Sequence, residues 1–97
     1  MAFHTATMDA PDLVAIGTAI DVQNLRDKAV IISGTFTATA VVEASFDGMT
    51  FVRVGRTTDL AAIVQVPFAC RALRINTTAY TDGAINANLV ADNPRTS

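Results

Sequence analysis

A strictly alternating run from Phe36 to Phe46 constrains the fold of this chain more than any other stretch of its sequence. Every even position of the run is apolar, whereas the odd positions carry mainly Thr, Glu and Ser. A period of two is typical of a β-strand that buries one face. The run is followed by Asp47-Gly48, a dipeptide that suits a tight turn, and a second β-rich run begins at Met49. The stretch therefore predicts a β-hairpin.

The register of this hairpin has two solutions. A two-residue loop pairs Phe46 with Met49 and turns Phe51 toward the core. A three-residue loop with a bulge turns Val52 and Val54 inward instead. Because a slip of one residue exchanges the two faces of a strand, the sequence leaves both registers open.

Further β-branched and apolar runs predict the remaining strands. Residues 73–80 alternate clearly, and Asp82-Gly83 then repeats the turn signal, which predicts a second hairpin closed by residues 85–91. Gly17 indicates a bulge or a point of close approach in the first strand. A single helical turn at 60–63 is the alternative to a strand there. The predicted strands cover residues 13–22, 28–33, 35–46, 49–55, 60–66, 73–80 and 85–91.

These segments predict an all-β chain, a single antiparallel β-sandwich or jelly-roll-like barrel of about seven strands. A length of 97 residues suits one domain. We expect residues 1–12 to form an N-terminal arm, residues 13–91 the sandwich domain, and residues 92–97 a C-terminal tail. The two ends lack the periodicity of the strands, which is why they are set apart.

Composition limits the partners of the chain. Hydrophobic residues make up 51% of the sequence and charged residues 16%, which is more apolar material than a thin sandwich must bury. We therefore expect a homo-oligomer or a larger assembly to cover the surplus. No apolar run reaches the ~18–20 residues of a membrane helix, so no membrane partner is expected. A net charge of −2 with seven scattered basic residues predicts no direct nucleic-acid partner.

Chemical motifs are sparse. The single His, His4, falls in the expected arm, and the single Cys, Cys70, has no partner for a disulfide or a metal site and is interpreted as a buried thiol. The carboxylates fall at strand ends and turns, where bonds to the backbone account for them. A weak Ca²⁺ site among these loop carboxylates is the alternative. We expect no catalytic residues, no cofactor and no enzymatic activity.

The outward faces of the alternating strands are the candidate binding surfaces. They are nearly uncharged and rich in Thr and Asn, so they are cheap to desolvate in a protein–protein contact. The alternative is a plain solvated sheet face. With two residues of the expected arm added, the candidate interface residues are Phe3, His4, Thr35, Thr37, Thr39, Arg74, Asn76, Thr78, Tyr80, Asn86 and Asn88.

Three segments, residues 34–51, 66–68 and 72–83, together resemble the small β-sandwich modules of tailed-bacteriophage virion proteins. The resemblance implies a structural virion protein that is made and assembled in the cytoplasm of the bacterial host. The short length and apolar surplus favour a capsid decoration, or cement, protein that binds across major capsid protein subunits. Similar modules occur in neck, tail and fibre proteins, so a neck, tail or fibre component is the alternative. The residues that carry the resemblance are Gly34-Thr35-Phe36, Ser45-Phe46-Asp47-Gly48 and Leu73-Arg74-Ile75 with Thr78, Tyr80 and Gly83.

Residues 45–54 and 71–75 also resemble strands of discoidin-type carbohydrate- or lipid-binding domains. Those domains are longer and usually secreted with a disulfide, which a chain with one Cys cannot form internally. A carbohydrate-binding module is therefore the second functional hypothesis.

Overall fold

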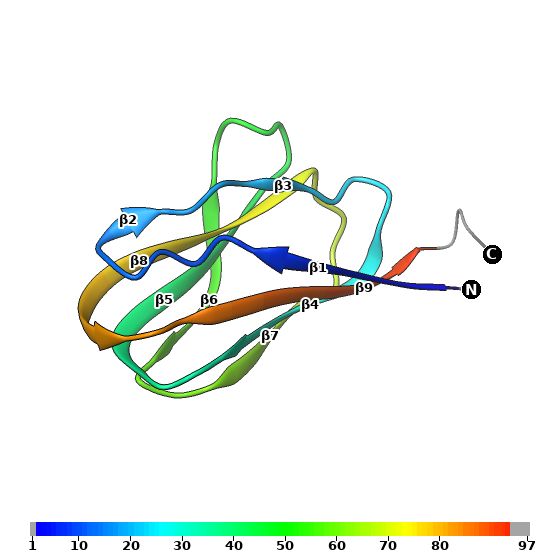
Figure 1. Cartoon of the computed structure of the whole chain (residues 1–97). Coiled ribbons are helices and arrows are strands. Elements are labelled where there is room, and N and C mark those ends of the chain that lie inside the picture. The colour runs from blue at the N-terminus through cyan, green and yellow to red at the C-terminus, as the bar shows by residue number, and fades with distance from the viewer. Residues whose placement is uncertain (1, 94–97) are drawn as a thin grey trace.

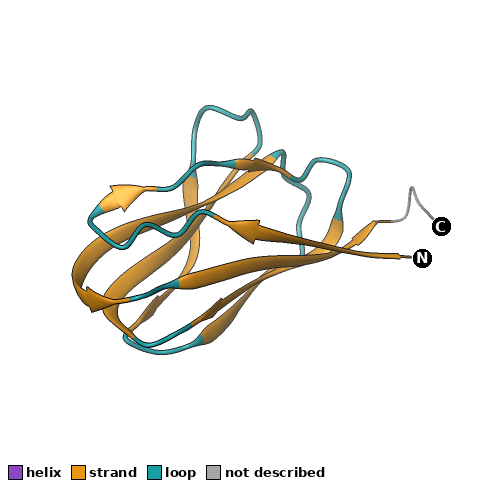
Figure 2. Ribbon diagram, viewed as in Figure 1, coloured by secondary structure: helices purple, strands orange, loops and turns teal. Residues whose placement is uncertain are grey.

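The computed structural model describes residues 2–93, with side chains for residues 4–92, and in this part of the chain it contains nine strands and no helix. The strands form two antiparallel sheets packed against each other (Figures 1 and 2). The all-β sandwich is thus confirmed, with nine strands in place of about seven. One sheet has the order β1 (Ala2–Met8), β9 (Asn86–Asn93), β4 (Arg26–Ser33), β7 (Ala62–Val66). The other has the order β2 (Ala15–Ile16), β8 (Ala72–Gly83), β5 (Phe36–Ser45), β6 (Val52–Thr58), and β3 (Ile20–Asp21) also pairs with β8.

The hydrophobic core lies between the two sheets. The alternation of β5 holds as predicted, because its even positions from Phe36 to Ala44 are all buried. Leu73 and Ile75 of β8 are fully buried beside them, and each side chain of this size contributes about 1.5–3 kcal/mol when removed from water. The opposite sheet supplies Val30, Ile32, Val66, Ala87, Leu89 and Ala91 to the same core.

The predicted hairpin between β5 and β6 is present, and its loop is longer than either expected register allows. The faces agree with the second solution, because Val54 packs against the core and Val52, although 63% exposed, shares the face of buried Ala44. Ala44 pairs with Val52, so the connection spans residues 46–51. Phe46 lies in this loop, 71% exposed, and not on the core face. A further register shift falls between Val42 and Glu43.

Asp47 explains why this loop is long. Its Oδ1 accepts hydrogen bonds from the Met49 and Thr50 N–H groups, each at 2.8 Å, and from the Ser45 hydroxyl at 2.9 Å. The Gly48 N–H donates to the Ser45 hydroxyl oxygen at 2.8 Å. The loop therefore closes on its own side chains, as Asp-based turns do, and needs no tight two-residue turn. The Thr50 N–H above all, then the Met49 N–H and the Ser45 hydroxyl, hold the pKa of Asp47 far below its usual range.

The expected N-terminal arm at residues 1–12 requires a correction. Ala2–Met8 is a strand at the edge of one sheet, paired along its length with β9 from Ala2↔Asn93 to Met8↔Ala87. Only the segment after Met8 is irregular. The C-terminal tail also begins later than expected, since β9 includes Asp92 and Asn93, and residues 94–97 lie outside the described residues.

The second predicted hairpin is wrong because β8 and β9 belong to different sheets. Gly83 has a φ of +95°, the Ala84 N–H donates to the Thr35 carbonyl at 2.9 Å, and Ile85 is buried. The chain thus crosses from one layer to the other at the end of the core (Figure 1). A left-handed glycine permits this sharp change of direction.

The predicted first strand at residues 13–22 is replaced by the two-residue strands β2 and β3. Gly17 lies between them and is the point of close approach that the sequence indicated. Its N–H donates to the Ile75 carbonyl at 2.7 Å, and a Cβ at this position would lie 2.1 Å from the Asp9 carbonyl oxygen. Residues 60–63 form no helical turn.

Candidate functional site

The outward surface of the β1-β9-β4-β7 sheet carries no charged side chain over most of its area. Cross-strand pairs place Thr7, Asn88, Ile31 and Ile63 in one row across the four strands. Ile63 is 66% exposed in this row. Charged residues are rare at the centre of protein–protein interfaces. We call this surface the uncharged face and define it as Thr5, Thr7, Ala29, Ile31, Ser33, Ile63, Gln65, Asn86, Asn88 and Val90.

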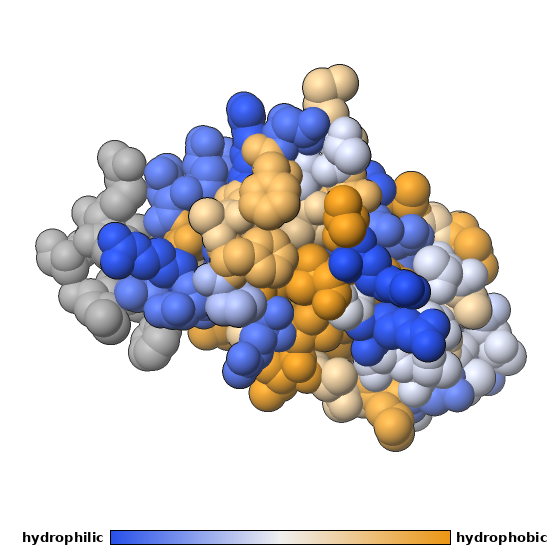
Figure 3. Space-filling model, turned by 180° about the vertical axis from the view of Figure 1, so that it is seen from behind, coloured by the Kyte–Doolittle hydropathy of each residue, from blue (hydrophilic) through white to orange (hydrophobic). Residues whose placement is uncertain are grey.

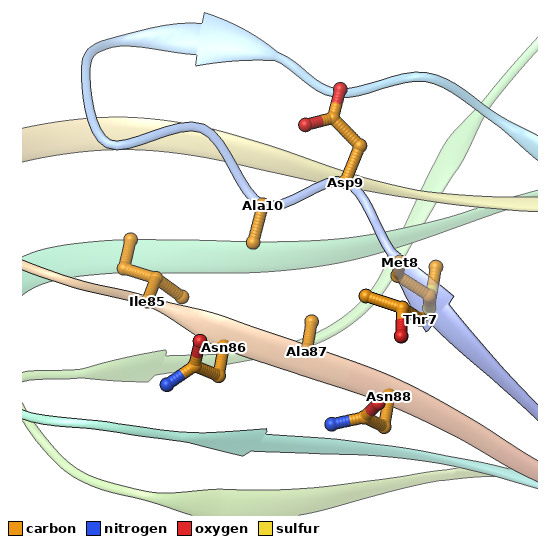
Figure 4. A pocket seen from close by; sticks show the side chains of 8 residues that line it. All are labelled: Thr7, Met8, Asp9, Ala10, Ile85, Asn86, Ala87 and Asn88. Carbon is orange, nitrogen blue, oxygen red and sulfur yellow. The ribbon is translucent and has the colours of Figure 1, made fainter.

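A broad, open pocket of about 620 Å³ adjoins the uncharged face, where β1 ends and β9 begins. Figure 4 shows Asn86 and Asn88 leaving β9 on one side and Ala87 on the other. The Asp9 carboxylate at the rim accepts a hydrogen bond from the Thr18 N–H at 2.8 Å. The pocket thus offers amide and hydroxyl groups at the margin of the face and no grouped catalytic side chains.

The predicted interface residues divide between the two sheets. The predicted second hairpin would place Asn86 and Asn88 beside Arg74 and Asn76, but the crossing from β8 to β9 puts them on the opposite side of the sandwich. His4 is half-buried on β1 opposite Ala91. The Phe3 side chain lies outside the described residues. The others, Thr35, Thr37, Thr39, Arg74, Asn76, Thr78 and Tyr80, belong to the β8-β5-β6 side and its turn.

Arg74 and Asn76 are brought together by Glu43. The Arg74 Nε lies 2.7 Å from Glu43 Oε1, and the Asn76 side-chain amide donates to Glu43 Oε2 at 3.3 Å. The Arg74 guanidinium also lies 3.9 Å from the centre of the Phe51 ring, a cation–π contact. These contacts satisfy the groups within the chain, so they brace this sheet and leave little for a partner. Thr39 is likewise bonded, to the Thr58 hydroxyl at 3.0 Å.

Tyr80 does not face outward as predicted. The register between β5 and β8 shifts between Thr39↔Ala79 and Ala40↔Thr77, which leaves Thr78 as an extra, exposed residue. Such a bulge exchanges the faces of the residues beyond it. Tyr80 therefore packs against the core, and its hydroxyl donates to the Gly83 carbonyl at 2.6 Å.

Apolar side chains gather at one end of the sandwich, formed by loops 22–25, 46–51 and 67–71, which we call the Phe46 end. The Phe46 and Phe68 rings lie 6.0 Å apart at 39°. Beside them is a pocket of about 360 Å³ lined by Ala44, Phe46, Val52, Arg53, Val54 and Phe68. Figure 3 shows apolar side chains gathered on one face and bordered by hydrophilic ones. Exposed Met49 extends the apolar surface of this end.

Lys28 holds part of this end in place. It is only 2% exposed, and its Nζ donates to the Phe68 carbonyl at 3.0 Å and to the Leu25 carbonyl at 3.3 Å. A buried ammonium requires such acceptors. Lys28 therefore fixes the 67–71 loop and the Phe68 ring that the loop carries.

Reactive groups are not assembled into a site in the described part of the chain. Cys70 is a buried free thiol, as predicted, and burial raises its pKa while the charge of Lys28 opposes the rise. Among residues 4–92, no three His, Cys, Asp or Glu side chains are grouped so that they could hold a metal ion. Over the same part of the chain, no helix is present that could cross a membrane.

Sequence reasoning named Asn86 and Asn88 of the uncharged face and missed its other residues and the Phe46 end. The uncharged face contains residues of four strands. Thr5 and Thr7 were missed because residues 1–12 were expected to form an arm, whereas Ala2–Met8 is a strand. Their alternation with half-buried Ala6 and buried Met8 was the available signal. The Phe46 end was hidden because the alternating pattern assigned Phe46 to the core.

Comparisons with known proteins place the fold. No protein-family model matches the sequence, and no curated protein matches it. The crystal structure of SPBc2 prophage-derived protein YomS matches with a TM-score of 0.77 at 14% sequence identity, over 94% of this chain and 94% of that one. This chain therefore shares its all-β fold, over almost its whole length, with a protein derived from a prophage.

Proposed function

We propose that the chain is a non-enzymatic structural subunit of a tailed-phage virion, and specifically a capsid decoration protein. The observation that carries the proposal is the uncharged face, a sheet surface that a partner can cover without desolvating a single charge. The shared fold with YomS, a prophage-derived protein, supports a phage setting. The proposed partner is the major capsid protein, across neighbouring subunits of the head.

The size of the uncharged face limits how it can bind. Four strands about 4.8 Å apart, each with a rise of about 3.3 Å per residue, give a surface of roughly 20 by 20 Å. A standard interface buries about 800 Å² on each partner, so the face alone is too small. The edge of β1 adjoins it, and among the described strands β1 pairs with β9 alone, so its outer edge is open to a partner. We therefore include the β1 edge in the proposed contact.

A decoration protein with no enzymatic activity stabilises the head through thermodynamic linkage between its binding and the disassembly of the lattice. A subunit that binds the assembled lattice and not the separated subunits raises the free energy of disassembly, by about 2.7 kcal/mol per site at a free concentration 100 times the Kd. Heads that carry the chain should therefore withstand heat or chelators better than heads that lack it.

The proposal is tested by locating the chain in particles. Heads, tails and complete virions from the host that carries the gene are separated on a density gradient, and each fraction is probed with an antibody against the chain. We expect the chain in heads and virions. Its presence in tails alone would contradict decoration, and its absence from all particles would contradict a virion role.

Two matched variants test the face. Ile63→Asp introduces a charge on the uncharged face, whereas Ile16→Asp introduces the same charge at a site of similar exposure, 56% against 66%, on the opposite sheet. Both substitutions replace exposed side chains, so both variants should fold. We expect Ile63→Asp to reduce binding to heads at least tenfold and Ile16→Asp to leave it unchanged. Equal binding of the two variants would reject the uncharged face.

A further inference from the structure

β1 forms an open edge of its sheet, because no other described strand lies along its outer side. Natural proteins protect such edges with charged side chains, Pro, bulges, covering segments or very short strands, since an open row of N–H and C=O groups pairs with other chains. β1 has seven residues, contains no Lys, Arg, Asp, Glu or Pro, and pairs with β9 without a register shift. It therefore lacks the protections that sequence and pairing can supply.

The other edges among the described strands are protected. β7, at the far side of the same sheet, has five residues and is followed by Pro67. β6 packs beside it, so closely that a Cβ at Gly55 would lie 2.8 Å from Val64 Cγ1. β6 carries Arg53 and Arg56, and its pairing with β5 contains a register shift. β2 and β3 have two residues each. The contrast singles out β1 as the edge that needs a partner.

The two faces of β1 restrict which strand can pair with it. His4 and Ala6 are half-buried and Met8 is buried, whereas Thr5 and Thr7 between them are exposed. Residues directly opposite each other in an antiparallel pair have side chains on the same face, so the partner strand must repeat this alternation. A second copy of β1 does so with all seven residues when a two-fold axis passes through Thr5. The opposed residues are then Thr5 and Thr5, His4 and Ala6, Phe3 and Thr7, and Ala2 and Met8.

We propose that two free copies of this chain pair antiparallel through β1 and join their β1-β9-β4-β7 sheets into one continuous sheet. The contact is isologous, so each copy covers the open edge of the other. The outer edges of the joined sheet are then the two β7 strands, which are protected, and association stops at two chains. This pairing does not rest on the proposed place of the chain in the virion. Because β1 cannot pair with a second copy and a capsid subunit at once, binding to a head through this edge would release the second copy.

Analytical ultracentrifugation of the full chain, from about 1 µM to about 1 mM, tests the number of copies. We expect the mass to rise from the 10.2 kDa of one chain to twice that value and no further. The dimer should persist at about 1 M salt, because backbone hydrogen bonds and not ion pairs hold the two strands together. A single-chain mass at every concentration, or growth beyond two chains, would overturn the proposal.

Amide hydrogen exchange followed by mass spectrometry locates the contact. Alternate N–H groups of an edge strand point away from its neighbour and exchange with water in the single chain. The exchange of the β1 peptide should therefore slow several-fold between a dilute and a concentrated sample, while the β7 peptide exchanges at the same rate in both. Slowing in β7 or elsewhere without slowing in β1 would show that the copies meet at another surface.

Two charged variants test the two-fold axis at Thr5. Thr5→Lys and Thr5→Glu each place like charges directly opposite each other in the dimer, which should weaken self-association about fivefold or more. Both replace an exposed side chain, and circular dichroism checks that both variants fold. An equimolar mixture should form a mixed dimer, because Lys then lies opposite Glu. If the mixture associates no better than either variant alone, the register is refuted.

Thr7→Lys is the matched control on the same strand and the same face. Thr7 lies opposite Phe3 of the other copy in the proposed register, so the two new ammonium groups would be four residues, about 13 Å, apart along the strands. This separation exceeds the screening length of about 10 Å at 0.1 M salt. Thr7→Lys should therefore weaken association clearly less than Thr5→Lys does. Equal weakening by the two variants would contradict an axis at Thr5.

Discussion

Gly17→Ala should destabilise the fold strongly, although it adds only one methyl group. The new Cβ would lie 2.1 Å from the Asp9 carbonyl oxygen and 3.0 Å from the Ile75 carbonyl oxygen. Both are backbone atoms, so no side-chain rotation relieves the contact. The 9–14 segment must move away by roughly 1 Å to restore a normal contact distance.

The magnitude follows from what this movement breaks. Three hydrogen bonds hold the segment, and each contributes about 0.5–1.5 kcal/mol, so their loss costs about 2–4 kcal/mol. One of them satisfies the hydroxyl of Thr77, which is fully buried. The bonds run from the Thr18 N–H to Asp9, from the Thr77 hydroxyl to Pro11 and from the Ile85 N–H to Asp12.

Urea and thermal unfolding followed by circular dichroism measure the effect. For a domain of this size, each kcal/mol lowers the Tm by about 4–8 °C, so we expect a decrease of roughly 10–30 °C. Gly48→Ala is the contrast: its Cβ would meet only the Arg71 side chain, at 3.6 Å, and its φ of +82° alone should cost about 1 kcal/mol. If Gly17→Ala stays within about 0.5 kcal/mol of the wild type, the close approach to Asp9 is wrong.

Three further predictions concern the core and its ends. Ile75→Ala, at a fully buried position, should cost about 2–5 kcal/mol in urea unfolding; a loss under 1 kcal/mol would contradict its place in the core. The Cys70 thiol, buried and raised in pKa, should react with a chromogenic disulfide reagent far more slowly in the folded than in the unfolded chain; equal rates would refute its burial. The depressed pKa of Asp47 means that its loop bonds stabilise the fold fully above the unfolded Asp pKa of about 3.9 and weaken as the pH falls below it. The Asp47 carboxyl signal in NMR should therefore titrate well below that value, and a midpoint near it would show that the loop bonds do not form.

Local patterns predicted those parts of the fold that depend on neighbours in sequence. The alternation from Phe36 to Ala44 identified a strand and its buried face because one sheet side packs on the core. Phe46 continues the same pattern, yet it is exposed, because the bonds of Asp47 end the strand at Ser45. Periodicity alone does not show where hydrogen bonds to a side chain, such as those of Asp47, replace the backbone hydrogen bonds between strands.

The parts that could not be predicted depend on distant partners. Ala2–Met8 becomes a strand because β9, at the other end of the chain, pairs with it. Lys28 read as the polar start of a strand, but its ammonium group bonds to the carbonyl of Phe68, 40 residues away. The uncharged face was invisible for the same reason: residues such as Thr7 and Ile63 become neighbours only once the sheet order is known.

The most direct measurement of the central claim is a cryo-EM reconstruction of purified heads, carried to a resolution at which the two sheets of the sandwich are distinguished. We predict density for this fold on the capsid lattice, with the β1-β9-β4-β7 sheet and the β1 edge turned toward major capsid protein subunits and the β2-β8-β5-β6 sheet turned away. Heads without this density, or with the opposite sheet against the lattice, would contradict the account.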